Sequence, residues 1–250
     1  MPRMHRENAP ALGASEVAKR FGSTVALAGV SLEVAAGECV ALVGESGSGK
    51  STLLRCFNRL VEPDSGTVTV GGMDVRGSDP IMLRRSIGYV PQDGGLLPHW
   101  RVRRNVALVP RLLGWADANT RADRALDLVG LPPDTFAERR PRQLSGGQRQ
   151  RVAIARALAA ESNVVLLDEP FGALDAITRA ELQDAFLRLR RNLRVTTLLV
   201  THDLHEADLL ADRIAVLRSG RIEQFASPAT LRRAPATPYV RELLERARLA

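Results

Sequence analysis

Residues 38–60 read ECVALVGESGSGKSTLLRCFNRL, and this stretch decides the fold. Its apolar run, residues 40–43, is typical of a strand that is buried on both faces, as strands of parallel sheets are. Apolar residues then recur at helical spacing, at Leu53, Leu54, Phe57, Leu60 and Val61. Between the strand and the helix, residues 44–51 fit the pattern G-x-x-x-x-G-K-[ST]. The order of strand, glycine-rich turn and helix therefore predicts a phosphate-binding loop.

The residue types of this loop suit a nucleotide. Gly44, Gly47 and Gly49 let successive backbone N–H groups point at one anion, and the helix N-terminus adds unpaired donors. Lys50 is placed to reach the β- and γ-phosphates, and the Ser51 hydroxyl is placed to ligate Mg²⁺. Lys50 is one of only two lysines among 35 basic residues. A compact ammonium binds phosphate in a tight loop in a way that a planar guanidinium cannot, so we expect nucleotide binding rather than an unliganded turn.

Composition places the chain among ordinary globular proteins. It has 250 residues, of which 45% are hydrophobic and 25% charged, enough for one large domain or two small ones. No apolar run is long enough to span a bilayer, and the N-terminal stretch lacks the apolar core of a signal peptide. We therefore expect a cytoplasmic protein. Cys39 and Cys56 lie on apolar segments, which favours reduced, packed thiols.

The net charge of +7 raises the question of an anionic partner. Nucleic acid and an anionic membrane surface are the usual ones. Here the arginines are scattered among acidic residues, which favours a solvated basic surface. We expect no nucleic-acid partner.

Other segments complete an α/β pattern. Residues 1–12 are expected to be peripheral. Strands are predicted at 25–34, 67–70, 87–90, 163–167, 195–200, 214–217 and 221–225, with hairpin turns at 71–72 and 219–220. Residues 100–160 are predicted to be helical with breaks at Pro110, Gly114 and 132–133, and further helices are predicted at 180–193 and in two short C-terminal segments. The helical stretch indicates an insertion in an α/β scaffold.

Charged residues follow two of the buried strands. Asp168 and Glu169 end the strand at 163–167, and buried carboxylates need compensation. A Mg²⁺ ion held by Asp168 and a water activated by Glu169 would supply it. His202 follows the strand at 195–200, at the end where open α/β sheets bind ligands.

Two further features leave alternatives open. LSGGQ, residues 144–148, begins a helix for which Ser145 is a good N-cap, and its two glycines allow close backbone approach to a ligand. Because one phosphate loop already exists, a second anion site here needs a second nucleotide or a second subunit. Phe21 is equally compatible with a core position and with stacking on adenine.

These residues together resemble the ATP-binding subunit of ATP-binding-cassette (ABC) transporters, over about residues 17–244. The resemblance implies an α/β phosphate-loop NTPase core with an antiparallel β subdomain. It also implies a helical subdomain at about 93–160, inserted in a core of 12–92 and 161–250 within a single ABC ATPase domain at 12–250. LSGGQ is the most specific part of the match, because other phosphate-loop families lack it.

The resemblance also implies site residues. The nucleotide would contact Phe21, Gly44, Glu45, Ser46, Gly47, Ser48, Gly49, Lys50, Ser51, Thr52, Ser145, Gly146, Gly147, Gln148 and Asp175. Mg²⁺ would be bound by Ser51, Gln92 and Asp168. Catalysis would use Glu169, His202, Lys50 and Gln92, and residues 173–175 would form the D-loop.

The resemblance implies several partners. Two copies would form a head-to-tail dimer, with ATP held between the phosphate loop of one copy and LSGGQ of the other. Glu169 would polarise the attacking water and His202 would hold the γ-phosphate, since phosphoryl transfer depends mainly on positioning and electrostatics. The dimer would bind ABC membrane permease subunits on the inner face of the cell membrane, together with an extracytoplasmic solute-binding protein.

A finer likeness concerns the solute. Residues 57–68 and 83–115 are similar to importers of quaternary-ammonium osmoprotectants such as glycine betaine, carnitine or choline. The alternatives are an importer of another small polar solute such as an amino acid, a soluble non-transport ABC ATPase, or a non-catalytic nucleotide binder. Residues 92–100 are expected to contact the permease through exposed Leu96, Leu97 and Trp100, the alternative being that these side chains pack the helical insertion.

Overall fold

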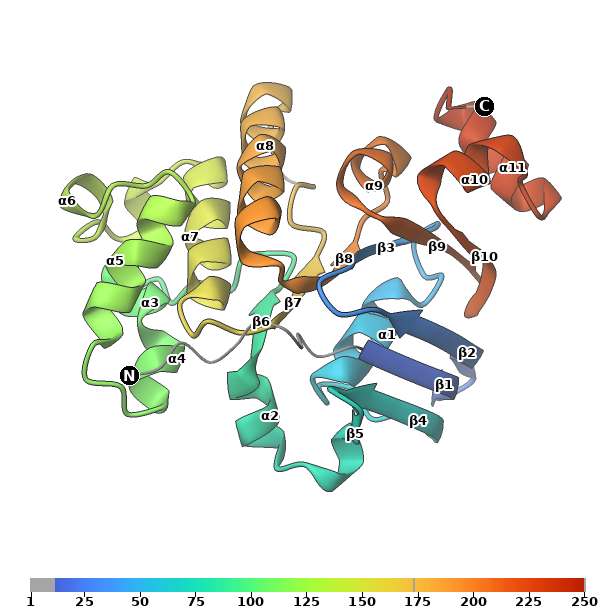
Figure 1. Cartoon of the computed structure of the whole chain (residues 1–250), viewed down its shortest axis with the longest axis horizontal. Coiled ribbons are helices and arrows are strands. Elements are labelled where there is room, and N and C mark those ends of the chain that lie inside the picture. Colours follow the sequence, from blue (N-terminus) through green and yellow to red (C-terminus); the bar gives the residue numbers. More distant parts are fainter. Residues whose placement is uncertain (1–11, 173, 250) are drawn as a thin grey trace. The chain divides into compact units, whose positions relative to one another are not determined.

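The strand that carries the phosphate loop belongs to one of two contact units of the chain. The computed structural model describes residues 12–172 and 174–249. By their contacts these divide into unit 1, residues 12–83 with 195–249, and unit 2, residues 84–194. Figure 1 labels their elements, and we describe each unit by itself.

In unit 1, strand β3 lies between two parallel neighbours. Strand β3 (Cys39–Val43) pairs in parallel with β8 (Thr196–Val200) and with β9 (Arg213–Arg218). Strand β10 (Arg221–Ala226) pairs with β9 as an antiparallel hairpin. Every residue of β3 and of β8 is buried. The predicted two-faced burial of the loop strand and the predicted C-terminal hairpin are confirmed.

A second sheet of unit 1 is wholly antiparallel. It contains β1 (Leu12–Phe21), β2 (Thr24–Val34), β4 (Ser65–Val70) and β5 (Met73–Asp74), in the order β2-β1-β4-β5. The strand predicted at 25–34 is confirmed, and so is the hairpin predicted from the strand at 67–70 and the turn at 71–72. Strand β1 was not predicted, because its register with β2 shifts between Ala14 and Val17 and again after Lys19, which interrupts the alternation of apolar and polar residues.

Helix α1 (Lys50–Phe57) follows the phosphate loop but is shorter than its apolar spacing predicted. Asn58 follows its last residue, and Arg59 has a positive φ of 53°. Leu60 therefore lies beyond the helix and is 49% exposed. Cys39 and Cys56 are free and buried, as predicted. Burial raises the pKa of Cys56 to about 12, so this thiol stays protonated at neutral pH.

The C-terminal helices of unit 1 pack on the β3 and β9 side chains. They are α9 (Leu204–Leu210), α10 (Pro228–Arg233) and α11 (Pro238–Arg246). The shared core consists of Ala41, Val43, Leu204, Ala207, Ile214, Val216, Leu231, Tyr239, Val240 and Leu244. Val43 immediately precedes the loop, so this core extends to the base of the loop. The unit also holds the short helix η1 (Val75–Gly77), and α2 (Pro80–Ser86) begins in it.

Unit 2 combines two parallel strands with several helices. Strand β6 (Ile87–Val90) pairs in parallel with β7 (Val164–Asp168), at the places predicted. Its helices are α3 (Val102–Val106), α4 (Leu108–Leu112), α5 (Ala118–Leu128), α6 (Pro133–Phe136), η2 (Pro141–Gln143), α7 (Gly146–Leu158) and α8 (Ala176–Leu193). The expected helical insertion at 93–160 falls within this unit.

Two helix boundaries differ from the prediction. Pro110 was expected to break the helical stretch but lies in the first turn of α4, where a missing N–H breaks no intrahelical bond. Helix α8 begins at Ala176, four residues before the predicted start, because the Asp175 carboxylate accepts a hydrogen bond from the Thr178 N–H and caps it.

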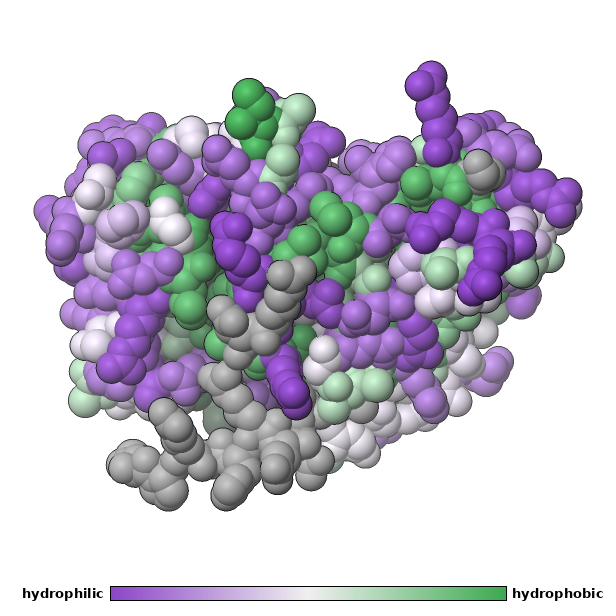
Figure 2. All heavy atoms as spheres, turned by 45° about the horizontal axis from the view of Figure 1, so that its top comes forward, coloured by the Kyte–Doolittle hydropathy of each residue, from purple (hydrophilic) through white to green (hydrophobic). Residues whose placement is uncertain are grey.

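The surface drawn in Figure 2 is mostly hydrophilic, with hydrophobic residues in separate areas. Within the described residues, the helices include none with the length and hydropathy that a membrane span requires.

Candidate nucleotide site

The phosphate loop holds its lysine against its own backbone. The Lys50 ammonium donates to the carbonyl oxygens of Gly44 and Glu45, both at 2.8 Å, and lies 3.5 Å from the Ser48 hydroxyl. Lys50 is only 5% exposed. The cation is thus placed inside the curve of the loop, the position from which it can meet a bound anion.

Two glycines of the loop are required by close backbone neighbours. A Cβ on Gly44 would lie 2.1 Å from the Leu217 carbonyl oxygen, and one on Gly49 would lie 2.4 Å from the Ala26 carbonyl oxygen. Gly49 also has a φ of 104° and is the N-cap of α1, where it offers no side-chain cap. The first turn of α1, which contains Ser51 and Thr52, therefore begins without a side-chain cap, at the helix end that favours an anion. Ser46 and Gly47, at the loop tip, are exposed.

His202 is placed by a buried polar network that the sequence did not reveal. The Thr201 hydroxyl donates to the Glu206 carboxylate at 2.6 Å and accepts from the Asp203 N–H at 3.0 Å. Asp203 in turn caps α9 by accepting from the His205 N–H at 2.8 Å. Because both neighbours of His202 are held by these bonds, its backbone is fixed at the carboxyl end of β8 while its side chain stays exposed.

Phe21 lies at the tip of the β1–β2 hairpin, paired with Thr24, and is 51% exposed. An exposed ring face favours the stacking interpretation over the core one. The Lys19 ammonium lies 5.4 Å from the ring centroid and 2.7 Å from the Asp64 carboxylate. Hydrogen bonds from Lys19 and from the Arg20 N–H lower the pKa of Asp64. The Asp64 carboxylate is therefore charged at neutral pH and binds both residues that precede Phe21.

In unit 2 the structure brings Gln92 and Glu169 together. The Gln92 amide donates to the Glu169 carboxylate at 3.2 Å. Asp168, the last residue of β7, is 1% exposed, and Glu169 after it has a positive φ of 48°. A non-glycine residue in this conformation is uncommon and is found at functional sites. The two adjacent acidic residues therefore differ in burial: Asp168 is buried and Glu169 is half-buried.

LSGGQ forms a complete capping box at the start of α7. The Gln148 N–H donates to the Ser145 hydroxyl at 3.2 Å, and the Ser145 N–H donates to the Gln148 side-chain oxygen at 3.1 Å. The predicted N-cap role of Ser145 is confirmed. Ser145 and Gly146 are exposed, so this turn presents its hydroxyl and its peptide groups to the solvent.

Gly147 has a packing role that the sequence did not reveal. A Cβ on it would lie 2.0 Å from the Thr178 methyl group, so the first turns of α7 and α8 touch at this point. Asp175 lies on the same turn, and hydrogen bonds from the Thr178 backbone and hydroxyl lower its pKa. Of the expected D-loop, Ala173 lies outside the described residues.

The contact between Gly147 and Thr178 yields a test by paired substitution. Gly147→Ala should lower the thermal midpoint by several degrees, because the added methyl overpacks a tight contact by roughly 1–3 kcal/mol. Gly147→Ala combined with Thr178→Ser removes the methyl that it strikes and should recover most of the loss. Calorimetry of the single and double variants measures both effects. Equal midpoints for the two variants would show that Thr178 is not the obstacle.

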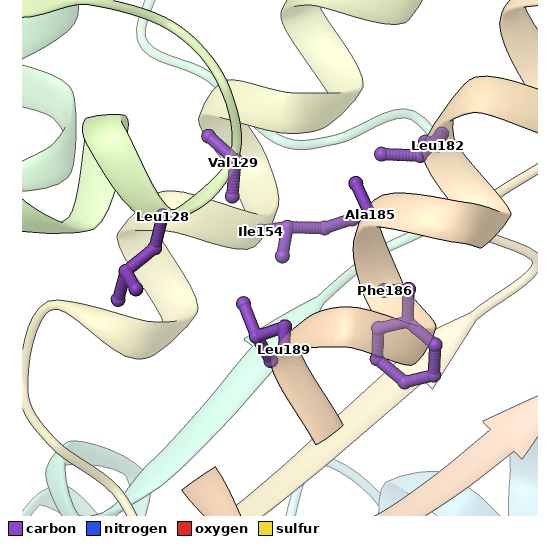
Figure 3. A pocket seen from close by; sticks show the side chains of 7 residues that line it. All are labelled: Leu128, Val129, Ile154, Leu182, Ala185, Phe186 and Leu189. Carbon is purple, nitrogen blue, oxygen red and sulfur yellow. The ribbon is translucent and has the colours of Figure 1, made fainter. Parts of the chain in front are cut away.

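The small cavity of unit 2 is a packing gap rather than a nucleotide site. It has room for about 10 Å³ between α5, α7 and α8. Figure 3 shows its lining, which is wholly apolar: Leu128, Val129, Ile154, Leu182, Ala185, Phe186 and Leu189. This space barely fits one water molecule and offers no side-chain hydrogen-bond partner.

Comparison with known proteins relates these features to a family. A carnitine transport ATP-binding protein of Listeria monocytogenes is 45% identical over 230 residues, 91% of this chain and 58% of that protein. A glycine betaine uptake system ATP-binding protein of Escherichia coli is 45% identical, covering 94% of this chain and 77% of that protein. A sulfate/thiosulfate import ATP-binding protein of Mycobacterium tuberculosis is 50% identical, and the match covers 94% of this chain and 66% of that protein. The chain spans only about 58–60% of the length of the carnitine and choline relatives.

Solved structures show the same fold. An ATP-binding cassette solved as a dimer with ADP and Pi matches with a TM-score of 0.77 and 34% identity, over 86% of this chain and 98% of that chain. A protein of Clostridium perfringens that is part of an ABC transporter complex matches with a TM-score of 0.81 and 29% identity, over 94% of both chains. The model of the ABC transporter family matches residues 27–172. Since that match covers more than half of the chain and contains both the phosphate loop and LSGGQ, the chain belongs to the ABC transporter family.

Proposed function

We propose that the chain is the ATP-hydrolysing subunit of an importer. The observation that carries the proposal is the phosphate loop, in which a buried Lys50 ammonium faces the loop interior at the start of α1. Glu169, at the turn after β7, supplies a carboxylate to polarise the attacking water, and Gln92 holds that carboxylate through its amide. His202, fixed at the end of β8, would contact the γ-phosphate. Positioning and electrostatic stabilisation would thus account for most of the acceleration of phosphoryl transfer.

The proposed Mg²⁺ ligands are all oxygen donors, as that ion prefers. They are the Ser51 hydroxyl in the first turn of α1, the buried Asp168 carboxylate and the Gln92 amide oxygen. When bound, Mg²⁺ neutralises charge on the β- and γ-phosphates. The protein's part is to hold the loop, the carboxylate and the water in position.

We propose a dimer as the working state. The capping box of LSGGQ supports this proposal, because its exposed Ser145 and Gly146 begin a helix at a site separate from the phosphate loop in sequence. Dimeric cassettes among the relatives support it as well. In the dimer, the Ser145 hydroxyl and the N–H groups after it would meet the γ-phosphate bound by the other copy.

Residues 92–100 are the proposed contact with a membrane permease. The Asn105 side chain is fully buried, accepts from the Leu97 N–H at 2.7 Å, and donates to the Leu97 carbonyl at 3.1 Å and the Trp100 carbonyl at 3.3 Å. Arg156 donates to the carbonyl oxygens of Gly95 and Gly94 at 2.6 and 2.7 Å. The segment therefore has a fixed shape and begins at a residue that touches Glu169.

The apolar side chains of this segment are less exposed than the sequence suggested. Leu96, Leu97 and Trp100 are half-buried, and the Arg104 guanidinium lies 4.1 Å from the Trp100 ring centroid. Each of these side chains is thus partly covered, and the remaining surface is what a permease helix would contact.

Leu97→Ser with Trp100→Ala tests the permease contact. We expect basal ATP hydrolysis to stay within about twofold, while stimulation by the permease in vesicles is lost, because a central apolar anchor contributes most of a small contact's energy. Met73→Ser serves as the control, since Met73 is 67% exposed in the other unit. Full stimulation of the double variant would place the permease contact elsewhere.

We propose a quaternary-ammonium osmoprotectant such as glycine betaine or choline as the solute. The carnitine and glycine betaine relatives support this. The sulfate/thiosulfate relative, with its 50% identity, favours an anion as the second candidate. The ATPase does not touch the solute, so the test is uptake of radiolabelled glycine betaine, choline and sulfate into vesicles that hold the chain and its permease. Uptake of sulfate alone would overturn the osmoprotectant assignment.

A further inference from the structure

A phenol from the last helix contacts the phosphate loop. The Glu45 N–H donates to the Tyr239 hydroxyl at 3.4 Å, across 194 residues of sequence. The carbonyl group of the same residue accepts from the Lys50 ammonium at 2.8 Å and from the Ser48 N–H at 3.1 Å. Both backbone groups of Glu45 therefore make hydrogen bonds. Tyr239 binds its N–H group, and the Lys50 ammonium binds its carbonyl group.

Tyr239 itself is firmly placed. Its side chain is 7% exposed within the core that also contains Val43 and Val240. The Arg218 guanidinium lies 4.6 Å from its ring centroid, in the range of a cation–π contact. Burial raises the pKa of Tyr239 above its ordinary value, so its hydroxyl stays neutral at physiological pH and brings no negative charge to a phosphate site.

The hairpin before this helix contacts the other end of the loop. The Gly220 N–H, in the β9–β10 turn, donates to the Ser48 carbonyl at 3.0 Å, and its own carbonyl accepts from the Ala28 N–H at 2.8 Å. The Leu217 carbonyl lies directly against Gly44. The loop is thus contacted at Gly44, Glu45 and Ser48 by residues that lie within 217–239.

We propose that Tyr239 is a positioning residue for the phosphate loop and that it sets nucleotide affinity by fixing the Gly44–Glu45 peptide group. The inference rests on the proposed function of the loop. A loop held in its binding conformation loses less conformational entropy when the nucleotide binds, so the affinity is higher. Without the phenol, the Gly44–Glu45 peptide group can rotate, and the Gly44 carbonyl, which accepts from the Lys50 ammonium at 2.8 Å, rotates with it.

Tyr239→Phe tests the proposal because it removes only the hydroxyl. The ring, its core contacts and the Arg218 contact remain. We expect the Kd for MgADP to rise by roughly 2- to 10-fold, the effect of one lost hydrogen bond. We also expect the thermal midpoint without nucleotide to change by less than about 2 °C, and faster hydrogen exchange of the Glu45 amide. Titration calorimetry, differential scanning calorimetry and amide exchange of the full chain measure the three quantities.

Val240→Ala is the matched control, since Val240 is adjacent, 1% exposed and in the same core. It should lower the midpoint by several degrees through lost packing, with the Kd for MgADP unchanged. The proposal is overturned if Tyr239→Phe binds MgADP like the parent, or if both variants weaken binding in proportion to their lost stability. Lys50→Ala tests the proposed nucleotide site independently of the proposed role of Tyr239. If this variant keeps full affinity for MgADP, the phosphate loop is not the nucleotide site.

Discussion

Glu169→Gln should reduce ATP hydrolysis by roughly 10²- to 10⁴-fold, the range for losing a general base. The amide keeps the size of the side chain and still offers an oxygen to the Gln92 amide, which lies 3.2 Å from the carboxylate. What is lost is the negative charge that polarises water. Nucleotide binding should be retained, so an ATP-bound dimer should accumulate and be visible by size-exclusion chromatography.

Glu181→Gln is the control for this substitution. Glu181 lies in the same unit on α8, is 63% exposed and pairs with Arg151 at the surface, so the variant should hydrolyse ATP at the parent rate. Steady-state phosphate release from both variants gives the comparison. Parent activity in Glu169→Gln would mean that another group activates the water.

Lys50→Ala should weaken MgATP binding by roughly 10- to 100-fold, since a hydrogen bond to a charged group contributes about 1.5–3 kcal/mol. The loss also leaves the carbonyl oxygens of Gly44 and Glu45 without their shared donor. Lys50→Arg should not restore affinity, because the planar guanidinium is too large for a position that is 5% exposed. Fluorescence titration with a nucleotide analogue measures both variants.

The other lysine provides the contrast. Lys19→Arg keeps the positive charge beside Phe21 and the ion pair with Asp64. We expect its affinity to stay within about threefold of the parent. If Lys19→Arg lost as much affinity as Lys50→Ala, the effect of Lys50→Ala would not be specific to the lysine of the loop.

The parts of the fold that the sequence predicted are those with a strong local signal. Strands β3, β7 and β8 each contain a run of three or more apolar residues, because each strand is buried on both faces. The start of α7 was predictable because a capping box uses two residues three positions apart.

The parts that were not predicted depend on partners distant in sequence. Strand β1 has irregular register, and helix α9 is short and depends on the Asp203 cap and the Glu206–Thr201 contact. The role of Tyr239 could not be read from its neighbours, since the N–H that it accepts belongs to Glu45. Gly147 was expected to allow close backbone approach to a ligand, and its contact with the Thr178 methyl group of α8 could not be read from the sequence.

The placement of β3 between β8 and β9 has a consequence for synthesis of the chain on the ribosome. Both hydrogen-bonded neighbours of the loop strand come from residues 196–218, about 150 residues after the loop itself. At roughly 5–20 residues per second, these neighbours appear about 8–30 seconds later. During that interval the loop strand has neither of its hydrogen-bonded neighbours and the Glu45 N–H has no Tyr239 hydroxyl to bind, so we expect this sheet to form only after residues 196–239 have been made.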